Sequence, residues 1–142
     1  MNLNTDFIKK LRNSGLRPTK QRIKICKVLF DTEKTFHFTI NDLVKIIREK
    51  LSQKISLATV YNTVHAFKKK GYLKEISINS DKNYFDTNTS IHHHFYDEDT
   101  NELIDCDVNA IDSVNVKNNI TGKKINSVEV LIKVANDTQN QN

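Results

Sequence analysis

The chain reverses its electrical sign at one point, and this reversal constrains its fold more than any other feature of the sequence. Residues 1–85 contain 18 lysines and arginines against 7 acidic residues, which gives a net charge of +11. Residues 86–142 contain 4 basic residues against 10 acidic ones, a net charge of −6. An AT-rich genome would explain a surplus of lysine, but not opposite signs in the two parts. We therefore expect two modules with different chemistry.

The basic part contains four segments with the apolar spacing of amphipathic helices. Two of them open at capping residues: Thr39 with Asp42 three positions later resembles a capping box, and Ser56 caps the fourth segment, which Gly71 ends. Another opens at Pro18-Thr19. We expect helices at 4–13 and 57–69, and between them one that opens at Pro18-Thr19 and one that opens at Thr39, with inner positions as far as Phe30 and Leu51.

The fourth helix is expected to have two different faces. Its buried stripe is apolar: Leu57, Val60, Val64 and Phe67. The opposite face is small, polar and uncharged: Ala58, Thr59, Asn62 and Ala66, with Tyr61 and His65 at the border. Such a face is unusual in a basic region and suits a helix that enters the DNA major groove, where bulky charges would block approach to the base edges.

A strand, a turn and a strand are expected next, at 73–78, 79–82 and 83–86. Helices followed by such a hairpin are typical of a winged helix-turn-helix. The alternative is a helical bundle with an added hairpin. We expect the winged helix to form a DNA-binding domain over residues 1–86.

The acidic part is expected to form a small α/β dimerisation and sensing domain at 91–134, after a hinge at 87–90 and before a polar tail at 135–142. Its predicted elements are strands at 92–96, 102–106 and 125–134 and a helix at 109–119. The overall class is therefore α+β. Hydrophobic residues make up only 37% of the chain, which favours a homodimer that completes its core at the interface.

Three of the five histidines are consecutive: His92, His93 and His94. On a strand, the first and third point to one face, where they can bind one ion such as Zn²⁺ or Fe²⁺. Two imidazoles rarely suffice, so carboxylates must join them. Asp86 and Asp105, each at a strand end, are candidates. The alternative is that the triplet is only the polar edge of a strand.

Other residues have a functional and a structural interpretation. His37 either reaches the metal from the basic part or only begins a helix, and His65 lies at the DNA groove or at the surface. Cys26 is expected in the core and Cys106 at a strand end. The two cysteines are far apart in the sequence, and the chain contains no CxxC motif. Reduced cysteines and apolar runs of at most three residues indicate a cytoplasmic protein with no membrane span.

Three motifs together resemble the ferric uptake regulator (Fur) family of metal-dependent bacterial repressors. They are Gly15-Leu-Arg-Pro-Thr-Lys-Gln-Arg22, Ser56-Leu-Ala-Thr-Val-Tyr-Asn62, and Tyr84-Phe-Asp86 followed by the His92–His94 triplet. The resemblance implies that Arg17 enters an A/T-rich minor groove and that Tyr61 packs on thymine methyl groups. It also implies one regulatory site for Fe²⁺ or Mn²⁺ (Zn²⁺ in vitro), with five ligands: His37, Asp86, His92, His94 and Asp105.

The DNA-binding set is completed by two further residues of the fourth helix. Asn62 can pair with adenine through two hydrogen bonds, and Thr59 lies on the same outer face. Asp97-Glu98-Asp99-Thr100 stands where the family usually has a CxxC, so a structural zinc site with four cysteines is excluded.

The missing cysteines, the triplet and Asn62 are similar to the iron response regulator (Irr) branch of the family. This likeness implies a regulator, mainly a repressor, that responds to iron or haem and binds A/T-rich inverted repeats as a dimer. Haem would bind at His92, His93 and His94, and a partner protein would deliver it. The alternatives are a peroxide- or manganese-sensing repressor of the same family and, from another class, a non-haem iron enzyme. We expect no enzyme.

Overall fold

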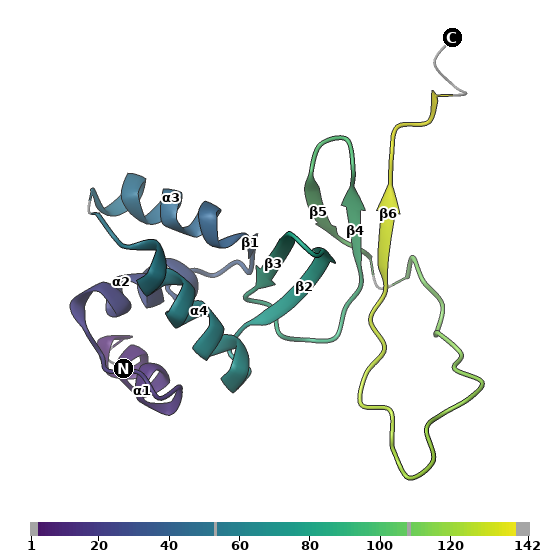
Figure 1. The fold of residues 1–142 in the computed structure, drawn as a ribbon, viewed down its shortest axis with the longest axis horizontal. Coiled ribbons are helices and arrows are strands. Elements are labelled where there is room, and N and C mark those ends of the chain that lie inside the picture. Colours follow the sequence, from purple (N-terminus) through teal and green to yellow (C-terminus); the bar gives the residue numbers. More distant parts are fainter. Residues whose placement is uncertain (1–2, 53, 108, 139–142) are drawn as a thin grey trace. The chain divides into compact units, whose positions relative to one another are not determined.

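The computed structural model describes residues 3–52, 54–107 and 109–138 of the chain (Figure 1). The chain divides into two compact units, residues 1–89 and 90–142. The fold combines helices with two small antiparallel or mixed sheets, so the expected α+β class is confirmed. Over the part of the chain that the structure describes, no helix has the length and apolar character needed to cross a membrane.

The first unit contains the four expected helices. Their bounds are α1 Leu3–Asn13, α2 Lys20–Phe30, α3 Ile40–Leu51 and α4 Leu57–Lys70. Thr39 and Asp42 form the expected capping box at α3, and the side chain of Ser56 accepts a hydrogen bond from the amide of Thr59 at α4. Gly71 ends α4 with a φ of 93°, a conformation that favours glycine.

A three-stranded antiparallel sheet completes the first unit. Its strands are β1 His37–Phe38, β2 Lys74–Asn79 and β3 Lys82–Asp86, in the order β1-β3-β2. The hairpin of β2 and β3 was expected as the wing of the winged helix. β1 was not expected, because two residues are too few to show an alternating pattern.

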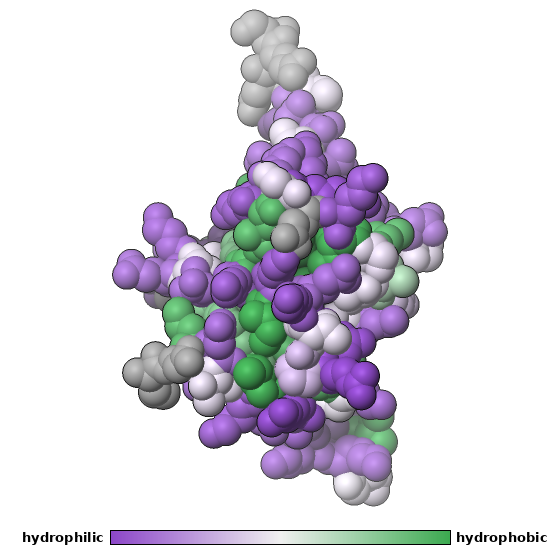
Figure 2. All heavy atoms as spheres, turned by 90° about the vertical axis from the view of Figure 1, so that its left-hand side faces the viewer, coloured by the Kyte–Doolittle hydropathy of each residue, from purple (hydrophilic) through white to green (hydrophobic). Residues whose placement is uncertain are grey.

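One hydrophobic core lies between the helices and the sheet of this unit. Its members are Phe7, Leu11, Ile25, Cys26, Leu29, Phe38, Leu43, Val44, Ile47, Ile55, Val60, Val64, Phe67, Leu73 and Phe85. The prediction for Leu57 was wrong: it is 53% exposed, because it is the first residue of α4 and lies outside the turns that pack inward. The surface over the helices is mainly hydrophilic, with apolar patches between the polar side chains (Figure 2).

The second unit contains a separate three-stranded sheet in the order β5-β4-β6. Its strands are β4 His94–Asp97, β5 Glu102–Asp105 and β6 Leu131–Val134. β4 pairs antiparallel with β5 through a tight turn, in which the carboxylate of Asp97 accepts hydrogen bonds from the amides of Asp99 and Thr100. β4 pairs parallel with β6. β5 ends opposite His94, where β6 also begins, so the connection between β5 and β6 carries the chain past β4 to its other edge.

Three predictions for the second unit were wrong. No helix forms at 109–119 within the described residues. The segment is rich in asparagine and valine, which are weak helix formers, and its side chains are exposed apart from half-buried Ile111. The strand expected at 92–96 begins only at His94, and the strand expected at 125–134 is limited to β6. Of the expected tail, residues 135–138 are exposed, and residues 139–142 lie outside the described residues.

Candidate metal centre and DNA-binding face

The first candidate metal ligands lie side by side on neighbouring strands of the first unit. Asp86 on β3 is the register partner of His37 on β1, and the His37 Nε2 to Asp86 Oδ2 distance is 3.4 Å. Asp86 is only 1% exposed, and its other oxygen accepts a hydrogen bond from the amide of Asn88 at 2.8 Å. A carboxylate buried so completely requires positive charge close by.

Lys74 supplies positive charge on the other side of Asp86. It is the register partner of Asp86 on β2, so Asp86 lies between an imidazole and an ammonium group. Burial lowers the pKa of Lys74 from its usual value, and the negative charge of Asp86 partly opposes that shift. Sequence reasoning did not single out Lys74, because its relation to Asp86 follows from the strand register and not from spacing along the chain.

The second candidate cluster lies in the second unit. Asp105 Oδ1 is 3.4 Å from His92 Nε2 and 3.2 Å from His94 Nε2. One potential ligand atom from each of these three residues lies within 4.8 Å of the others. The strand register explains part of this geometry, because Asp105 on β5 is directly opposite His94 on β4. His92 precedes the strand, so its position does not come from the strand alternation that we expected.

The hydrogen bond of His92 decides which ring nitrogen can bind a metal. Nδ1 of His92 lies 2.7 Å from the carbonyl oxygen of Ser90. A carbonyl oxygen only accepts, so Nδ1 carries the proton, and Nε2 of the neutral ring presents a lone pair toward Asp105. A lone pair that faces a carboxylate oxygen requires a cation, either a proton or a metal ion. The two imidazoles and the carboxylate, together with the hydrogen bond that orients the His92 ring, therefore fit a metal site.

His93 has a different role from its two neighbours. Its Nδ1 accepts a hydrogen bond from the amide of Val130 at 2.9 Å, so in the neutral ring the proton is on Nε2. Neither nitrogen then offers a lone pair to a metal or to haem iron. The side chain instead ties β4 to the segment that leads into β6. Haem binding by the whole triplet is not supported.

The expected DNA-binding residues all lie in the first unit. Arg17 is exposed in the loop between α1 and α2, where its carbonyl accepts a hydrogen bond from Arg22 Nη1 at 2.9 Å. Tyr61 and Asn62 are exposed on α4, with Tyr61 at 51%. Thr59 is less available, because its hydroxyl lies 2.7 Å from the hydroxyl of Ser56 at the helix start.

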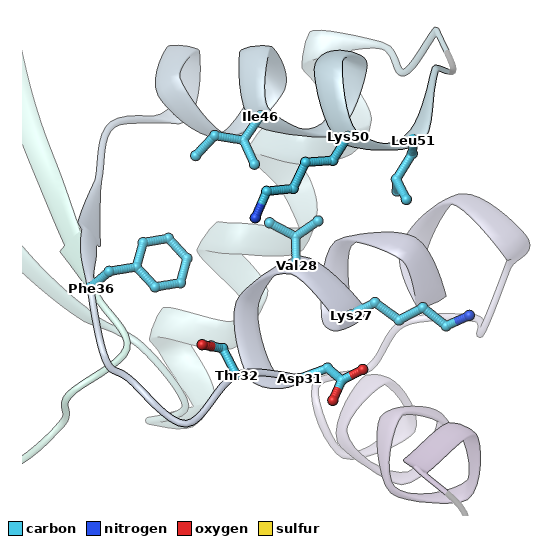
Figure 3. A pocket seen from close by; sticks show the side chains of 8 residues that line it. All are labelled: Lys27, Val28, Asp31, Thr32, Phe36, Ile46, Lys50 and Leu51. Atoms are coloured by element: carbon cyan, nitrogen blue, oxygen red, sulfur yellow. The ribbon is translucent and has the colours of Figure 1, made fainter.

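A depression lies between α2 and α3 (Figure 3). The side chains of Val28, Ile46 and Phe36 line it, and Lys27 points away from them. Asp31 is the one carboxylate in its lining, which contains no histidine or cysteine. Its charged side chains are those of Asp31, Lys27 and Lys50.

Cys26 is a core residue, as expected. It is fully buried in the first unit, and burial raises the pKa of its thiol to about 12. A thiol held in the protonated form is neither a good nucleophile nor a metal ligand. Cys26 therefore contributes packing and not chemistry.

Comparison with known proteins identifies the family of this chain. The model of the Ferric uptake regulator family matches residues 13–134. The chain belongs to this family. The chain is 32% identical over 109 residues to the peroxide-responsive repressor PerR of Staphylococcus epidermidis, covering 77% of this chain and 71% of PerR. It is 30% identical over 121 residues to the peroxide operon regulator of Bacillus subtilis, covering 84% and 81%.

Solved structures are similar in fold. The ferric uptake regulator of Vibrio cholerae matches with a TM-score of 0.66 and 23% identity, covering 90% of this chain and 98% of that one. The ferric uptake regulator of Pseudomonas aeruginosa, solved with manganese, matches with a TM-score of 0.64 and 21% identity, covering 92% and 97%.

Membership confirms several sequence-based predictions. Proteins of the family are metal-responsive transcription regulators that bind DNA and act as dimers, so the chain is a regulator and the non-haem iron enzyme is excluded. The relatives named above are peroxide-responsive regulators. The iron response regulator branch is not confirmed by them and stays a prediction.

Proposed function

We propose that this chain is a metal-dependent transcriptional repressor that senses Fe²⁺ or Mn²⁺ and, in its iron form, peroxide. One observation carries the proposal: His92 and His94 both direct Nε2 at the same oxygen of Asp105. Imidazole and carboxylate ligands without thiolate suit Fe²⁺ and Mn²⁺, and they accept Zn²⁺ in vitro. The similarity to peroxide-responsive relatives favours this function over the haem-responsive one.

We propose further that the ion takes ligands from both units: His37 and Asp86 from the first, and His92, His94 and Asp105 from the second. In this arrangement the metal adds positive charge beside the two carboxylates, of which Asp86 is buried and Asp105 is exposed. It also fixes the orientation of one unit against the other, which is a physical means of coupling metal to DNA binding.

The first unit then binds the DNA. Arg17 inserts into an A/T-rich minor groove, while Tyr61, Asn62 and Thr59 approach bases in the major groove. The second unit forms the homodimer, and its exposed apolar side chains support this role: Ile91, Ile104, Val114, Val116, Ile120 and Ile125. A dimer matches an inverted-repeat operator, because the symmetry of the protein is mirrored in the DNA. The cytoplasm is the expected compartment of such a DNA-binding protein.

The experiment is fluorescence anisotropy of a labelled A/T-rich inverted-repeat duplex at fixed salt, because phosphate contacts make affinity depend on salt. The full-length protein is titrated metal-free, with Mn²⁺, and with haem. We expect Mn²⁺ to tighten binding and haem to leave it unchanged. Binding that haem alone abolishes would replace this proposal with the haem-responsive one, together with its haem-delivering partner.

A pair of variants on β5 makes the test specific to the site. Asp105→Ala should lose the Mn²⁺ effect, whereas Glu102→Ala, an exposed acidic residue of the same strand, should retain it. Equal behaviour of the two variants would show that the metal acts elsewhere.

Peroxide sensing has its own test. The iron-loaded protein is treated with hydrogen peroxide and analysed by mass spectrometry of its peptides, with the Mn²⁺-loaded protein as the control. We expect oxygen addition at His92 or His94 only with iron, accompanied by loss of operator binding. Operator binding that survives peroxide in the iron form would exclude the peroxide function and leave a sensor of metal alone.

A further inference from the structure

The strand pair of β1 and β3 presents different residues on its two faces. His37 pairs with Asp86, and in the next rung Phe38 pairs with Phe85. Because side chains alternate along a strand, the two phenylalanines lie on the face opposite the metal ligands. Their rings stack with centroids 5.9 Å apart, and both are buried. This face therefore holds two aromatic rings in fixed positions.

His65 connects this pair of rings to the outer face of α4, which we propose approaches the DNA bases. Its ring meets Phe85 edge to face, with centroids 5.5 Å apart and an interplanar angle of 84°. Its other neighbour is Tyr61, one helical turn earlier on α4, at 4.1 Å between centroids. Burial decreases along the series, from buried Phe85 through half-buried His65 to exposed Tyr61. His65 thus lies between a buried ring and the ring at the surface.

We propose that His65 is a positioning residue for DNA recognition, which holds the ring of Tyr61 in one orientation on the outer face of α4. The inference rests on the proposed contact of Tyr61 with thymine. An exposed side chain that is already ordered loses less conformational freedom when it binds, so pre-orientation improves both affinity and selectivity. Phe85 provides the support, because its ring is buried in the hydrophobic core of this unit.

Contact with a flat ring, and not the polarity of imidazole, carries this role. The contacts of His65 with Tyr61 and Phe85 are ring contacts. Phenylalanine should therefore replace His65, whereas alanine should not. This difference separates a positioning role from a direct hydrogen bond between His65 and a base, which phenylalanine could not make.

The test compares two A/T-rich duplexes in the presence of Mn²⁺: one with thymine and one with uracil at every thymine position, which removes the methyl groups. The proteins are the full-length wild type, His65→Ala, His65→Phe, Tyr61→Ala and the double variant His65→Ala/Tyr61→Ala. Lys69→Ala, an exposed change in the last turn of α4, serves as the matched control. Thermal unfolding of each variant shows that it is folded.

We expect wild type to prefer the thymine duplex. His65→Ala should weaken binding to that duplex by about three- to tenfold, with little change for uracil, because loss of one ordered contact corresponds to roughly that factor. His65→Phe should restore the preference. In the Tyr61→Ala background, His65→Ala should have no further effect, since the residue acts through Tyr61. Lys69→Ala should weaken both duplexes equally.

Failure of the positioning role and failure of the proposed function give different results. If Tyr61→Ala abolishes the thymine preference but His65→Ala leaves it unchanged, the positioning role is wrong while DNA binding through Tyr61 stands. If wild type binds neither duplex better than a random sequence with Mn²⁺, the proposed function fails, and the inference fails with it.

Discussion

The two units of this protein differ in how they are held together. In the first, helices and strands contribute to one shared hydrophobic core. In the described residues of the second, the buried hydrophobic side chains are Tyr96, Leu103 and Cys106, and several large apolar residues are exposed. The first unit therefore has the means to fold by itself. The second depends on what it binds, which we infer to be a metal ion and a second copy of the chain.

The largest expected effect tests the core of the first unit. Phe67→Ala should lower the free energy of unfolding by about 3–5 kcal/mol, because it removes a fully buried ring and leaves a cavity. Urea denaturation followed by circular dichroism measures the loss. The matched change in the second unit is Ile104→Ala at an exposed position, which should alter stability by less than about 0.5 kcal/mol in the monomer. Similar losses of stability for the two variants would contradict the difference in packing between the two units.

Metal should stabilise the second unit. At a free Mn²⁺ concentration of 100 times Kd, binding to the folded state alone adds about 2.7 kcal/mol to the free energy of unfolding. Thermal unfolding with and without Mn²⁺ gives this quantity for wild type. His94→Ala should lose it, since that side chain is buried beside Asp105. A variant stabilised as much as wild type would show that His94 is no ligand.

A smaller effect is expected at the start of α4. Ser56→Ala removes the side chain that accepts a hydrogen bond from the amide of Thr59. It should lower the free energy of unfolding by about 1 kcal/mol. Val116→Ala, in the exposed connection of the second unit, should change stability by less than about 0.5 kcal/mol. Chemical denaturation of the two variants compares them directly. A loss at Val116 that matched the loss at Ser56 would mean that this connection packs against something, most directly a dimer partner.

The reactivity of the two cysteines allows a chemical comparison of the two units. Burial raises the pKa of Cys26 to about 12 from 9.0, so the unfolded thiol ionises first as pH rises. The contribution of Cys26 to stability is therefore full below pH 9 and declines between pH 9 and 12. With iodoacetamide at pH 8, we expect Cys106 to be alkylated before Cys26, because the second unit opens more readily. Mass spectrometry at intervals gives the order, and the reverse order would contradict the comparison.

The sequence predicted the first unit better than the second for a physical reason. The helices there carry strong local signals: the capping box at Thr39, the cap at Ser56 and the glycine at position 71. The second unit combines one local hairpin, β4 with β5, with a pairing between distant segments, β4 with β6. The parallel pairing of β4 with β6 leaves no local pattern, and the 109–119 segment was misassigned because its weak periodicity resembled a helix.

The candidate metal ligands came from motifs, but their chemistry did not. The sequence indicated that His92 and His94 belong together. It did not indicate that the carbonyl of Ser90 holds the proton on Nδ1 of His92. Nor did it indicate that Nδ1 of His93 accepts a hydrogen bond from the amide of Val130. These hydrogen bonds depend on backbone geometry. They separate the two histidines that fit a metal from the one that does not.

We infer that metal and operator bind to this protein with a coupled free energy. The most direct test is calorimetric titration of Mn²⁺ into the full-length protein, with and without a saturating A/T-rich inverted-repeat duplex. Coupling is reciprocal, so if metal tightens DNA binding, DNA must tighten Mn²⁺ binding by the same factor, and about 5–150-fold is typical. We predict a factor in this range. An Mn²⁺ affinity that the duplex leaves unchanged would contradict the account.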